Sequence, residues 1–283
     1  MFLEPMLLDK RESPFDDDRY VFEPKIDEHR LLYSVDRGEV RLFTRHQNDV
    51  TRQYPELHSL PIADVSDTVL DGEVASINPE TGTIEFERIM ERFMLRKPLA
   101  IQLAAVREPV HFYAFDILRY CGKDLRASPL TERKKILTEA VRPNPYCSVV
   151  MSVEGTGTAL FDVIKQRGME GIVAKRMTSR YIGRRSASWQ KIINYTYATV
   201  QIAGYRKNQF GWVAEHNGSP VGIIELAVPN EHKRAFYGLA DRLKTGEDRD
   251  YVYVKPRINV RVRFRNWTRK GMLRSPEFVE FVV

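Results

Sequence analysis

Short apolar runs alternate with polar stretches over the first two thirds of the chain. Runs rich in β-branched and aromatic residues predict strands at residues 31–36, 40–45, 68–77, 110–118 and 170–176. Between them, residues 130–141 have apolar side chains at helical spacing, with Leu130, Ile136, Leu137 and Val141 on one face. The pattern predicts a mixed α and β domain.

The last third of the chain has a different pattern. After Tyr195 the helical periodicity largely disappears, apart from a candidate helix at 231–243. Short strand runs separated by Gly, Asn and Pro replace it, at residues 199–205, 211–216, 221–228, 251–255 and 259–265. Several short strands in so few residues are typical of a small barrel such as the OB-fold, a common nucleic-acid platform. We therefore predict an α+β domain at 1–195 with antiparallel sheets, followed by a small all-β domain at 196–283.

Composition supports a folded protein of two domains. The chain has 283 residues, of which 43% are hydrophobic and 29% are charged. No segment approaches the roughly 20 apolar residues of a membrane helix, and acids occur too early for a secretory signal, so we expect a cytoplasmic protein without a membrane partner. The two cysteines, Cys121 and Cys147, cannot make a four-ligand zinc site, and we expect ordinary buried thiols.

The net charge of +6 is concentrated in the predicted second domain. Residues 196–283 hold 15 Lys and Arg against 9 Asp and Glu, a difference that equals the whole excess. A basic domain appended to a neutral one suggests binding to a polyanion, because Lys and Arg clusters bind phosphate largely without regard to sequence. Charge alone fits a solvated surface equally well.

A lysine in the first domain is a candidate nucleophile. In the segment EPKIDEHR, Lys25 follows Glu23 by two residues and precedes Asp27 by two, in an extended or turn context that Pro24 favours. By itself this pattern also fits an ordinary surface loop. Four further segments change the interpretation: LDGEVAS at 70–76, FYAFDIL at 112–118, EGIVAKR at 170–176 and SWQKIINY at 188–195.

In this order and spacing, the segments resemble the nucleotidyltransferase motifs of ATP-dependent DNA ligases, a family related to mRNA capping enzymes and RNA ligases. The resemblance covers nearly the whole chain, including a TRHQND segment around Arg45 and a tail with LRSPEF, similar to that of small bacterial ligases. Two positions depart from the family: Glu28 stands where Gly is usual, and Ile193 stands where many relatives have a second lysine. The resemblance implies a nucleotidyltransferase (adenylation) domain at 1–195 and an OB-fold DNA-binding domain at 196–283.

The resemblance also implies a reaction in three steps. Lys25 takes AMP from ATP, AMP passes to the 5′-phosphate of a nick in duplex DNA, and the neighbouring 3′-hydroxyl attacks and releases AMP. A free lysine amine has a pKa of about 10.4 and is almost entirely protonated at pH 7. A nucleophilic Lys25 therefore needs cationic neighbours or a metal ion to lower its pKa. The candidates for this positive charge are Lys175, Lys191 and bound Mg²⁺ (or Mn²⁺). The resemblance places Lys191 on the α-phosphate, and we expect Trp189 beside it to be a packing residue.

Two glutamates lie in apolar strand-like runs, where an unpaired carboxylate is costly. Glu73 and Glu170 therefore each need a partner, for which a structural salt bridge is one choice. The resemblance implies instead that Glu170 binds catalytic Mg²⁺ and that Glu73 binds the nucleotide ribose or the metal. It likewise matches Arg30 and Arg45 to sugar and phosphate contacts, and Glu23 to the adenine edge.

An aromatic residue is the candidate platform for the base. By resemblance Phe115 stacks on adenine, although an aromatic ring in an apolar strand is more often part of the core. Strand alternation places Tyr113 on the face of Phe115, and Phe112, Ala114 and Asp116 on the opposite face. We favour Phe115 as the platform and expect Asp116 to hold the fold.

The tail carries a stripe of arginines. In residues 259–265 strand alternation places arginines on one face and apolar residues toward the interior. The arginines are Arg261, Arg263 and Arg265, the apolar residues are Val260, Val262 and Phe264, and further cations follow at Arg269, Lys270 and Arg274. Charge on an edge strand also resists aggregation. Because three like charges repel unless a polyanion lies against them, we predict contacts to phosphates of DNA or of ATP.

Several alternatives remain at this point. NAD⁺-dependent ligases share the core motifs but carry a four-cysteine zinc module, which two cysteines cannot build, so we expect ATP. A capping-type guanylyltransferase and an RNA ligase are the nearest enzymatic alternatives, although the LRSPEF tail favours a DNA ligase. The departures at Glu28 and Ile193 also leave open a non-catalytic relative that binds nucleic acid. We expect a bacterial or phage-encoded monomer that acts on nicked duplex DNA.

Overall fold

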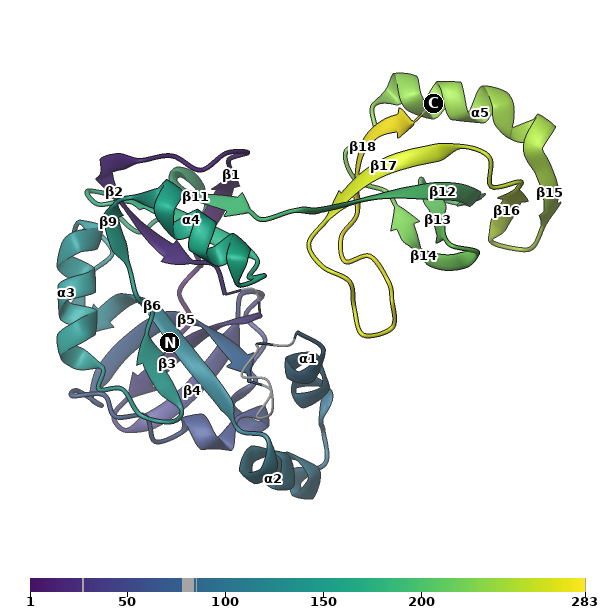
Figure 1. Ribbon diagram of the computed structural model, residues 1–283. Coiled ribbons are helices and arrows are strands. Elements are labelled where there is room, and N and C mark those ends of the chain that lie inside the picture. The colour runs from purple at the N-terminus through teal and green to yellow at the C-terminus, as the bar shows by residue number, and fades with distance from the viewer. Residues whose placement is uncertain (27, 78–83, 85, 283) are drawn as a thin grey trace. The chain divides into compact units, whose positions relative to one another are not determined.

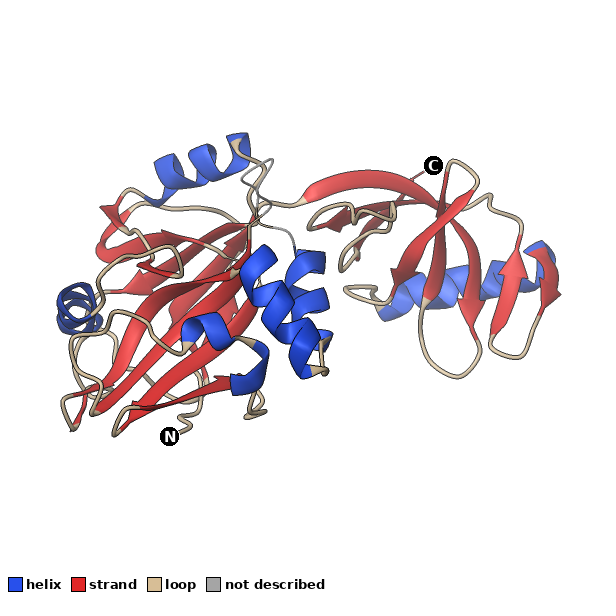
Figure 2. Cartoon of the chain, turned by 90° about the horizontal axis from the view of Figure 1, so that it is seen from below, coloured by secondary structure: helices blue, strands red, loops and turns tan. Residues whose placement is uncertain are grey.

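The chain divides into two compact units, Met1–Ile193 and Asn194–Val283 (Figure 1). The division falls two residues before the predicted boundary at Thr196. The computed structural model describes residues 1–26, 28–77, 84 and 86–282. Within this part of the chain, no helix is long and apolar enough to cross a membrane. Strands make up the interior of both units, and helices lie on the outside (Figure 2).

The first unit is built on two sheets. The five-stranded sheet has the order β1 (Leu7–Lys10), β11 (Arg185–Ile193), β10 (Gly171–Arg176), β2 (Asp17–Pro24) and β9 (Val153–Gly155). The six-stranded sheet has the order β4 (Glu39–Thr44), β3 (His29–Asp36), β5 (Asp67–Ser76), β6 (Val110–Tyr120) and β7 (Lys123–Asp124), with β8 (Cys147–Val149) also paired to β6. Neighbours are antiparallel except for the parallel pairs β1 with β11 and β6 with β8.

The two sheets pack face to face through an apolar layer. Val21 and Trp189 of the five-stranded sheet meet Leu32, Val69 and Leu118 of the six-stranded sheet, and all five are buried. The central strands β3 and β5 are therefore buried on both faces, which explains their nearly continuous apolar runs. Residues of both sheets also line one pocket.

Helices cover the outer faces of the two sheets. They are α1 (Phe86–Met94), α2 (Pro98–Arg107), α3 (Leu130–Ala140) and α4 (Gly157–Gln166), with 3-10 turns at Thr51–Gln53 and Pro55–Leu57. Leu160 and Ile164 of α4 pack on the five-stranded sheet. Leu137 and Ala140 of α3 pack in the hydrophobic core formed with the six-stranded sheet. The helix predicted at 130–141 is confirmed, but the buried face of α3 also includes Arg133, which periodicity did not predict.

The second unit is a sheet of short strands with one packed helix. Its strands are β12 (Thr196–Arg206), β13 (Trp212–His216), β14 (Ser219–Ile224), β15 (Lys244–Glu247), β16 (Tyr251–Val254), β17 (Asn259–Phe264) and β18 (Glu277–Val282), and its helix is α5 (Asn230–Leu243). All pairings along the sheet are antiparallel. Phe236 and Ala240 of α5 enter a core that includes Val260, Val262 and Phe264, so the predicted alternation in β17 is confirmed.

Two expectations from the sequence need correction. The strand predicted at 221–228 ends at Ile224 in β14, and β18 was not predicted.

Cys121 is exposed, not buried, because it lies in the turn between β6 and β7 with a φ of 49°. Cys147 is buried, and burial raises the pKa of its thiol to about 12. Both thiols are free.

Candidate active site

A pocket in the first unit is lined by both sheets. The lining residues are Leu8, Glu23, Pro24, Lys25, Ile26, Arg30, Glu73, Phe115, Val150, Val173, Lys175 and Trp189. Apolar side chains and several charged groups thus converge from strands that are far apart in the sequence. A mostly apolar pocket with a few polar groups is the usual form of a small-molecule site.

Lys25 lies directly after β2, where that strand leaves the five-stranded sheet. Its backbone N–H donates to the carbonyl oxygen of Gly171 at 2.8 Å, which fixes the start of the following loop. The Lys25 Nζ atom donates to Oε2 of Glu170 at 2.7 Å, and the two side chains are 12% and 8% exposed. The structure therefore holds an ammonium group against a carboxylate at the pocket edge.

Glu23 is buried between two lysines. Its Oε2 atom lies 2.7 Å from Nζ of Lys175, and its Oε1 atom accepts a hydrogen bond from Nζ of Lys134. Burial alone would raise the pKa of the Glu23 carboxyl, but the two ammonium groups outweigh burial and lower it. Glu23 is therefore an ionised carboxylate, which can only accept hydrogen bonds.

Lys175 also contacts two aromatic rings of the pocket. Its Nζ atom lies 4.2 Å from the ring centroids of both Phe115 and Trp189, within the range of a cation–π interaction. The Phe115 and Trp189 rings meet edge to face at 6.2 Å. Phe115 faces the pocket while Phe112 and Ala114 are buried on the opposite side, as strand alternation predicted. The same prediction is wrong for Asp116, which shares the face of Phe115 because the register of β6 against β5 shifts at this point.

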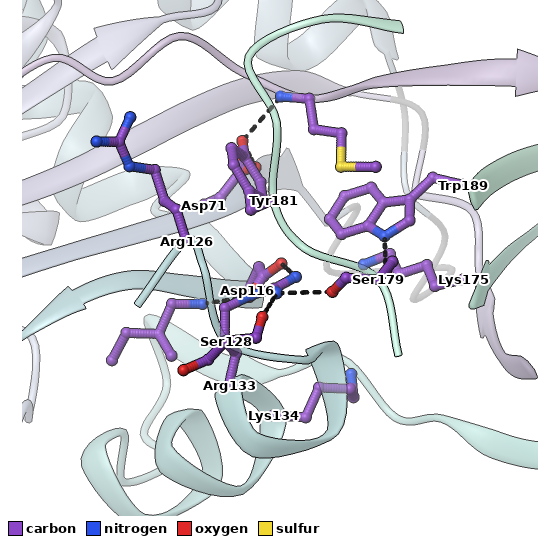
Figure 3. A network of polar contacts seen from close by, with 12 residues as sticks. Asp71, Asp116, Arg126, Ser128, Arg133, Lys134, Lys175, Ser179, Tyr181 and Trp189 are labelled. Atoms are coloured by element: carbon purple, nitrogen blue, oxygen red, sulfur yellow. Dashed lines mark hydrogen bonds and ion pairs between the residues drawn. The ribbon is translucent and has the colours of Figure 1, made fainter. Parts of the chain in front are cut away.

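Arg30 is held in place by a buried carboxylate. Its Nε and Nη2 atoms donate to the two oxygens of Asp71 at 3.0 and 2.6 Å, and its Nη1 atom donates to the carbonyl oxygen of Met6 at 2.8 Å. The Tyr181 hydroxyl donates to Asp71 at 2.6 Å and accepts from the Met6 N–H at 3.0 Å. The network joins β3, β5 and the N-terminal segment around the pocket. Figure 3 shows Asp71 and Tyr181 of this network.

A second buried ion pair involves Asp116, the residue after Phe115. Arg133 of α3 donates to both oxygens of Asp116 at 2.9 Å, and its Nη1 atom donates to the carbonyl oxygens of Ser128 and Ser179 at 2.6 and 3.0 Å (Figure 3). Both charged side chains are 0% exposed. The prediction that Asp116 holds the fold is confirmed.

The structure brings most of the predicted nucleotide residues together, but not all of them. Glu23, Lys25, Arg30, Glu73, Phe115 and Lys175 line one pocket. Arg45 lies instead at the exposed end of β4, where its Nε atom is 3.0 Å from Nε2 of His46. Lys191 lies on β11 beside Val173 of β10. Among the described residues that line this pocket, neither Arg45 nor Lys191 is present.

The two glutamates predicted to hold a metal ion have different surroundings. Glu73 lines the pocket opposite Arg30 in the strand register, and Glu170 pairs with Lys25. Within residues 1–26, 28–77, 84 and 86–282, no group of three or more His, Cys, Asp or Glu forms a metal cage. Carboxylate oxygens nevertheless fit Mg²⁺, which is usually bound by one or two carboxylates together with substrate phosphates.

The arginine stripe of the second unit has acidic neighbours that the sequence did not predict. Arg263 donates to Glu277 at 2.9 Å, and Arg261 lies 3.6 Å from Glu280, both glutamates being on the adjacent strand β18. The argument that these arginines repel one another unless a polyanion is bound is therefore wrong for Arg261 and Arg263. Strand pairing places the neutralising charge next to them.

Sequence reasoning missed several residues of the site. Leu8, Val150 and Val173 supply apolar walls, and Tyr181 and Lys134 hold charged groups of the pocket. Alternation could have placed Val173 on the same face as Lys175. No local signal identifies Lys134, which lies 111 residues from Glu23.

The chain is similar in sequence to known DNA ligases. A family model described as ATP dependent DNA ligase domain matches residues 5–192. The chain is 37% identical over 281 residues to the SPbeta prophage-derived DNA ligase-like protein LigB of Bacillus subtilis, covering 98% of each protein. It is 31% identical over 287 residues to the multifunctional non-homologous end joining protein LigD of Mycobacterium bovis, covering 91% of this chain but 35% of LigD.

Solved structures show the same relationship. The chain matches mycobacterial DNA ligase D complexed with ATP and MES, with 28% identity, a TM-score of 0.60, and coverage of 99% of this chain and 95% of that one. A structure of a Lig E DNA ligase has a similar fold at 16% identity, with a TM-score of 0.67 and coverage of 98% and 100%.

The fold of the first unit is that of the nucleotidyltransferase domains of DNA ligases. The chain belongs to the ATP-dependent DNA ligase family, whose general function is to seal nicks in DNA. It is therefore an enzyme of the ligase class, and ATP is the substrate that this family implies.

Proposed function

We propose that this enzyme seals nicks in duplex DNA through a covalent AMP adduct on Lys25. The observation that carries the proposal is the position of the Lys25 amine, at the edge of a pocket that contains Phe115, Glu23 and Glu73. Attack of Nζ on the α-phosphorus of ATP forms a phosphorus–nitrogen bond and releases pyrophosphate. The adduct then passes AMP to the 5′-phosphate of the nick, and the 3′-hydroxyl displaces it.

The other pocket residues have roles that follow from their chemistry. Phe115 offers a ring face for adenine, Glu23 offers an acceptor for its amino group, and Glu73 and Arg30 offer polar contacts for the ribose. Lys175 supplies positive charge close to the reacting centre. Arg45 and Lys191 are proposed to contact phosphate oxygens, and support for them rests on the sequence resemblance and not on the pocket.

Glu170 and Glu73 are the residues that would hold Mg²⁺ or Mn²⁺ with the phosphates of ATP. A bound divalent ion neutralises developing charge on phosphate oxygens. In the structure Glu170 Oε2 lies 2.7 Å from the Lys25 Nζ atom. This ion pair must separate, and the Lys25 amine must lose a proton, before Nζ can attack phosphorus.

Incubation with α-labelled ATP and Mg²⁺ tests this function directly. The protein should acquire one label that is acid-labile and alkali-stable, as expected for a phosphoramide, and should lose it to nicked DNA. α-labelled GTP and nicked RNA are the matching tests for the capping-type and RNA ligase alternatives. Absence of transfer from either nucleotide would support the non-catalytic relative.

We infer that the second unit is an OB-fold that binds the DNA duplex. Support comes from its sheet of short antiparallel strands, its single packed helix and its net basic charge. A bacterial monomer in the cytoplasm is the expected setting, in line with the bacterial and prophage-derived relatives.

The basic residues of this unit fall into two groups. Arg261 and Arg263 lie on β17 beside acidic partners, whereas the chain between β17 and β18 forms a separate hairpin (Figure 1). The hairpin is held by Arg265 N–H to Arg274 O at 3.1 Å and by Thr268 N–H to Met272 O at 2.9 Å. No acidic residue occurs in the sequence from 265 to 276.

Replacing Arg269 and Lys270 by Gln should reduce the slope of log binding constant against log salt by about 1.8 if both contact phosphates, since each contact contributes about 0.9. The same change at Arg261 and Arg263 tests the stripe in the same way. A salt titration of nicked-duplex binding measures the slope for wild type and for each variant. A slope that stays at the wild-type value would show that the replaced residues do not contact DNA phosphates.

A further inference from the structure

The Glu23 carboxylate is fixed by cations from two different elements. Lys175 belongs to β10 of the five-stranded sheet, and Lys134 belongs to α3, which packs against the six-stranded sheet. Each lysine takes a different oxygen of Glu23. Because Glu23 is only 2% exposed, its oxygens have little water to replace a lost lysine.

Lys134 differs from Lys175 in its relation to the pocket. Lys175 lines the pocket and lies against Phe115 and Trp189, so its replacement would alter the stacking surface. Among the described pocket-lining residues Lys134 is absent, and its contact with the pocket is through Glu23. Its side chain is 14% exposed.

The helix that carries Lys134 is itself firmly placed. The preceding residue, Arg133, is fixed by Asp116 and by the carbonyl oxygens of Ser128 and Ser179. Figure 3 shows Lys134 on α3 beside this network. The buried ion pair therefore sets the point from which Lys134 reaches Glu23.

A hydrogen-bond acceptor such as Glu23 at position 6 of a purine distinguishes adenine from guanine. Adenine carries an amino donor at position 6, whereas guanine carries an oxygen acceptor there. An ionised carboxylate can only accept, so it is complementary to adenine and opposes the guanine oxygen. A site built around a buried polar group rejects a ligand that leaves the group unpaired.

We propose that Lys134 is a positioning residue that holds the Glu23 carboxylate toward the purine edge and thereby sets the preference for adenine over guanine nucleotides. The inference rests on the proposed function, because it requires a nucleotide in this pocket. Lys134 lies outside the sequence segments that carry the family resemblance.

The test measures equilibrium binding of ATP and of GTP in EDTA by calorimetry, and AMP transfer separately with Mg²⁺. Lys134→Met keeps the length of the side chain and removes its charge. It should weaken ATP binding by about tenfold or more, with GTP binding changed by about twofold at most, so that the ATP to GTP preference falls. In the transfer reaction KM for ATP should rise while kcat at saturation changes little.

Three further variants keep the test decisive. Lys134→Arg retains a cation and should recover most of the preference. Lys135→Met removes the same charge from the next residue of α3 and should behave as wild type. Glu23→Gln offers an amide donor to guanine and should lose the preference for ATP.

The outcomes separate this inference from the proposed function. If Lys134→Met keeps the wild-type ATP to GTP ratio and only its melting temperature falls, the lysine is a structural ion pair and the inference is wrong. If wild type binds ATP and becomes labelled, but Lys134→Met keeps the wild-type ratio of ATP to GTP affinity, the proposed function holds and the inference about Lys134 is wrong. If wild type binds neither nucleotide, both are overturned.

Discussion

Lys25→Ala should lose the ability to acquire label from α-labelled ATP, with a decrease of at least about a thousandfold, because no other amine replaces the nucleophile. ATP binding should remain measurable, since Phe115, Glu23 and Glu73 are unchanged. Sealing of a nick that already carries AMP should be retained in part. The measurements are label transfer at saturating ATP and single-turnover ligation of the pre-adenylated nick.

Lys25→Arg is the matched control for this prediction. Arginine keeps a positive charge for Glu170, so the ion pair at the pocket edge and its contribution to stability should persist. Arginine is never deprotonated in proteins and should not react. A covalent AMP adduct on either variant would show that Lys25 is not the nucleophile.

Arg133→Met should lower the free energy of unfolding of the first unit by about 3–5 kcal/mol. Removing one partner of a buried ion pair leaves the other charge uncompensated, and Asp116 is 0% exposed. The carbonyl oxygens of Ser128 and Ser179 lose a donor at the same time. Urea denaturation followed by far-UV circular dichroism measures the change.

An exposed ion pair in the same region provides the comparison. Arg126, labelled in Figure 3, lies 2.6 Å from Asp124, but the two side chains are 41% and 44% exposed. Arg126→Met should therefore lower the free energy of unfolding by at most about 1 kcal/mol. Combining Arg133→Met with Asp116→Leu should cost less than the sum of the two single changes, because the buried charge is then absent. If Arg133→Met and Arg126→Met lower the free energy of unfolding equally, burial does not determine how much these ion pairs contribute to stability.

The sequence alone determined the features that depend on neighbouring residues. Alternation placed Val260, Val262 and Phe264 in the interior, and helical spacing located α3 and α5. The order and spacing of short motifs singled out six residues that line the pocket, namely Glu23, Lys25, Arg30, Glu73, Phe115 and Lys175. The strands and helices are visible in sequence because their periods repeat over two to four residues, whereas the pocket residues were identified by the resemblance to the ligase motifs.

The tertiary structure decided which charges meet. Lys134 reaches Glu23 across 111 positions, Arg133 pairs with Asp116 across 17, and Glu277 neutralises Arg263 from the adjacent strand. The sequence predicted a partner for a buried carboxylate such as Glu170 but could not name Lys25. Electrostatic partners depend on distance and burial in space, and side-chain periodicity contains neither.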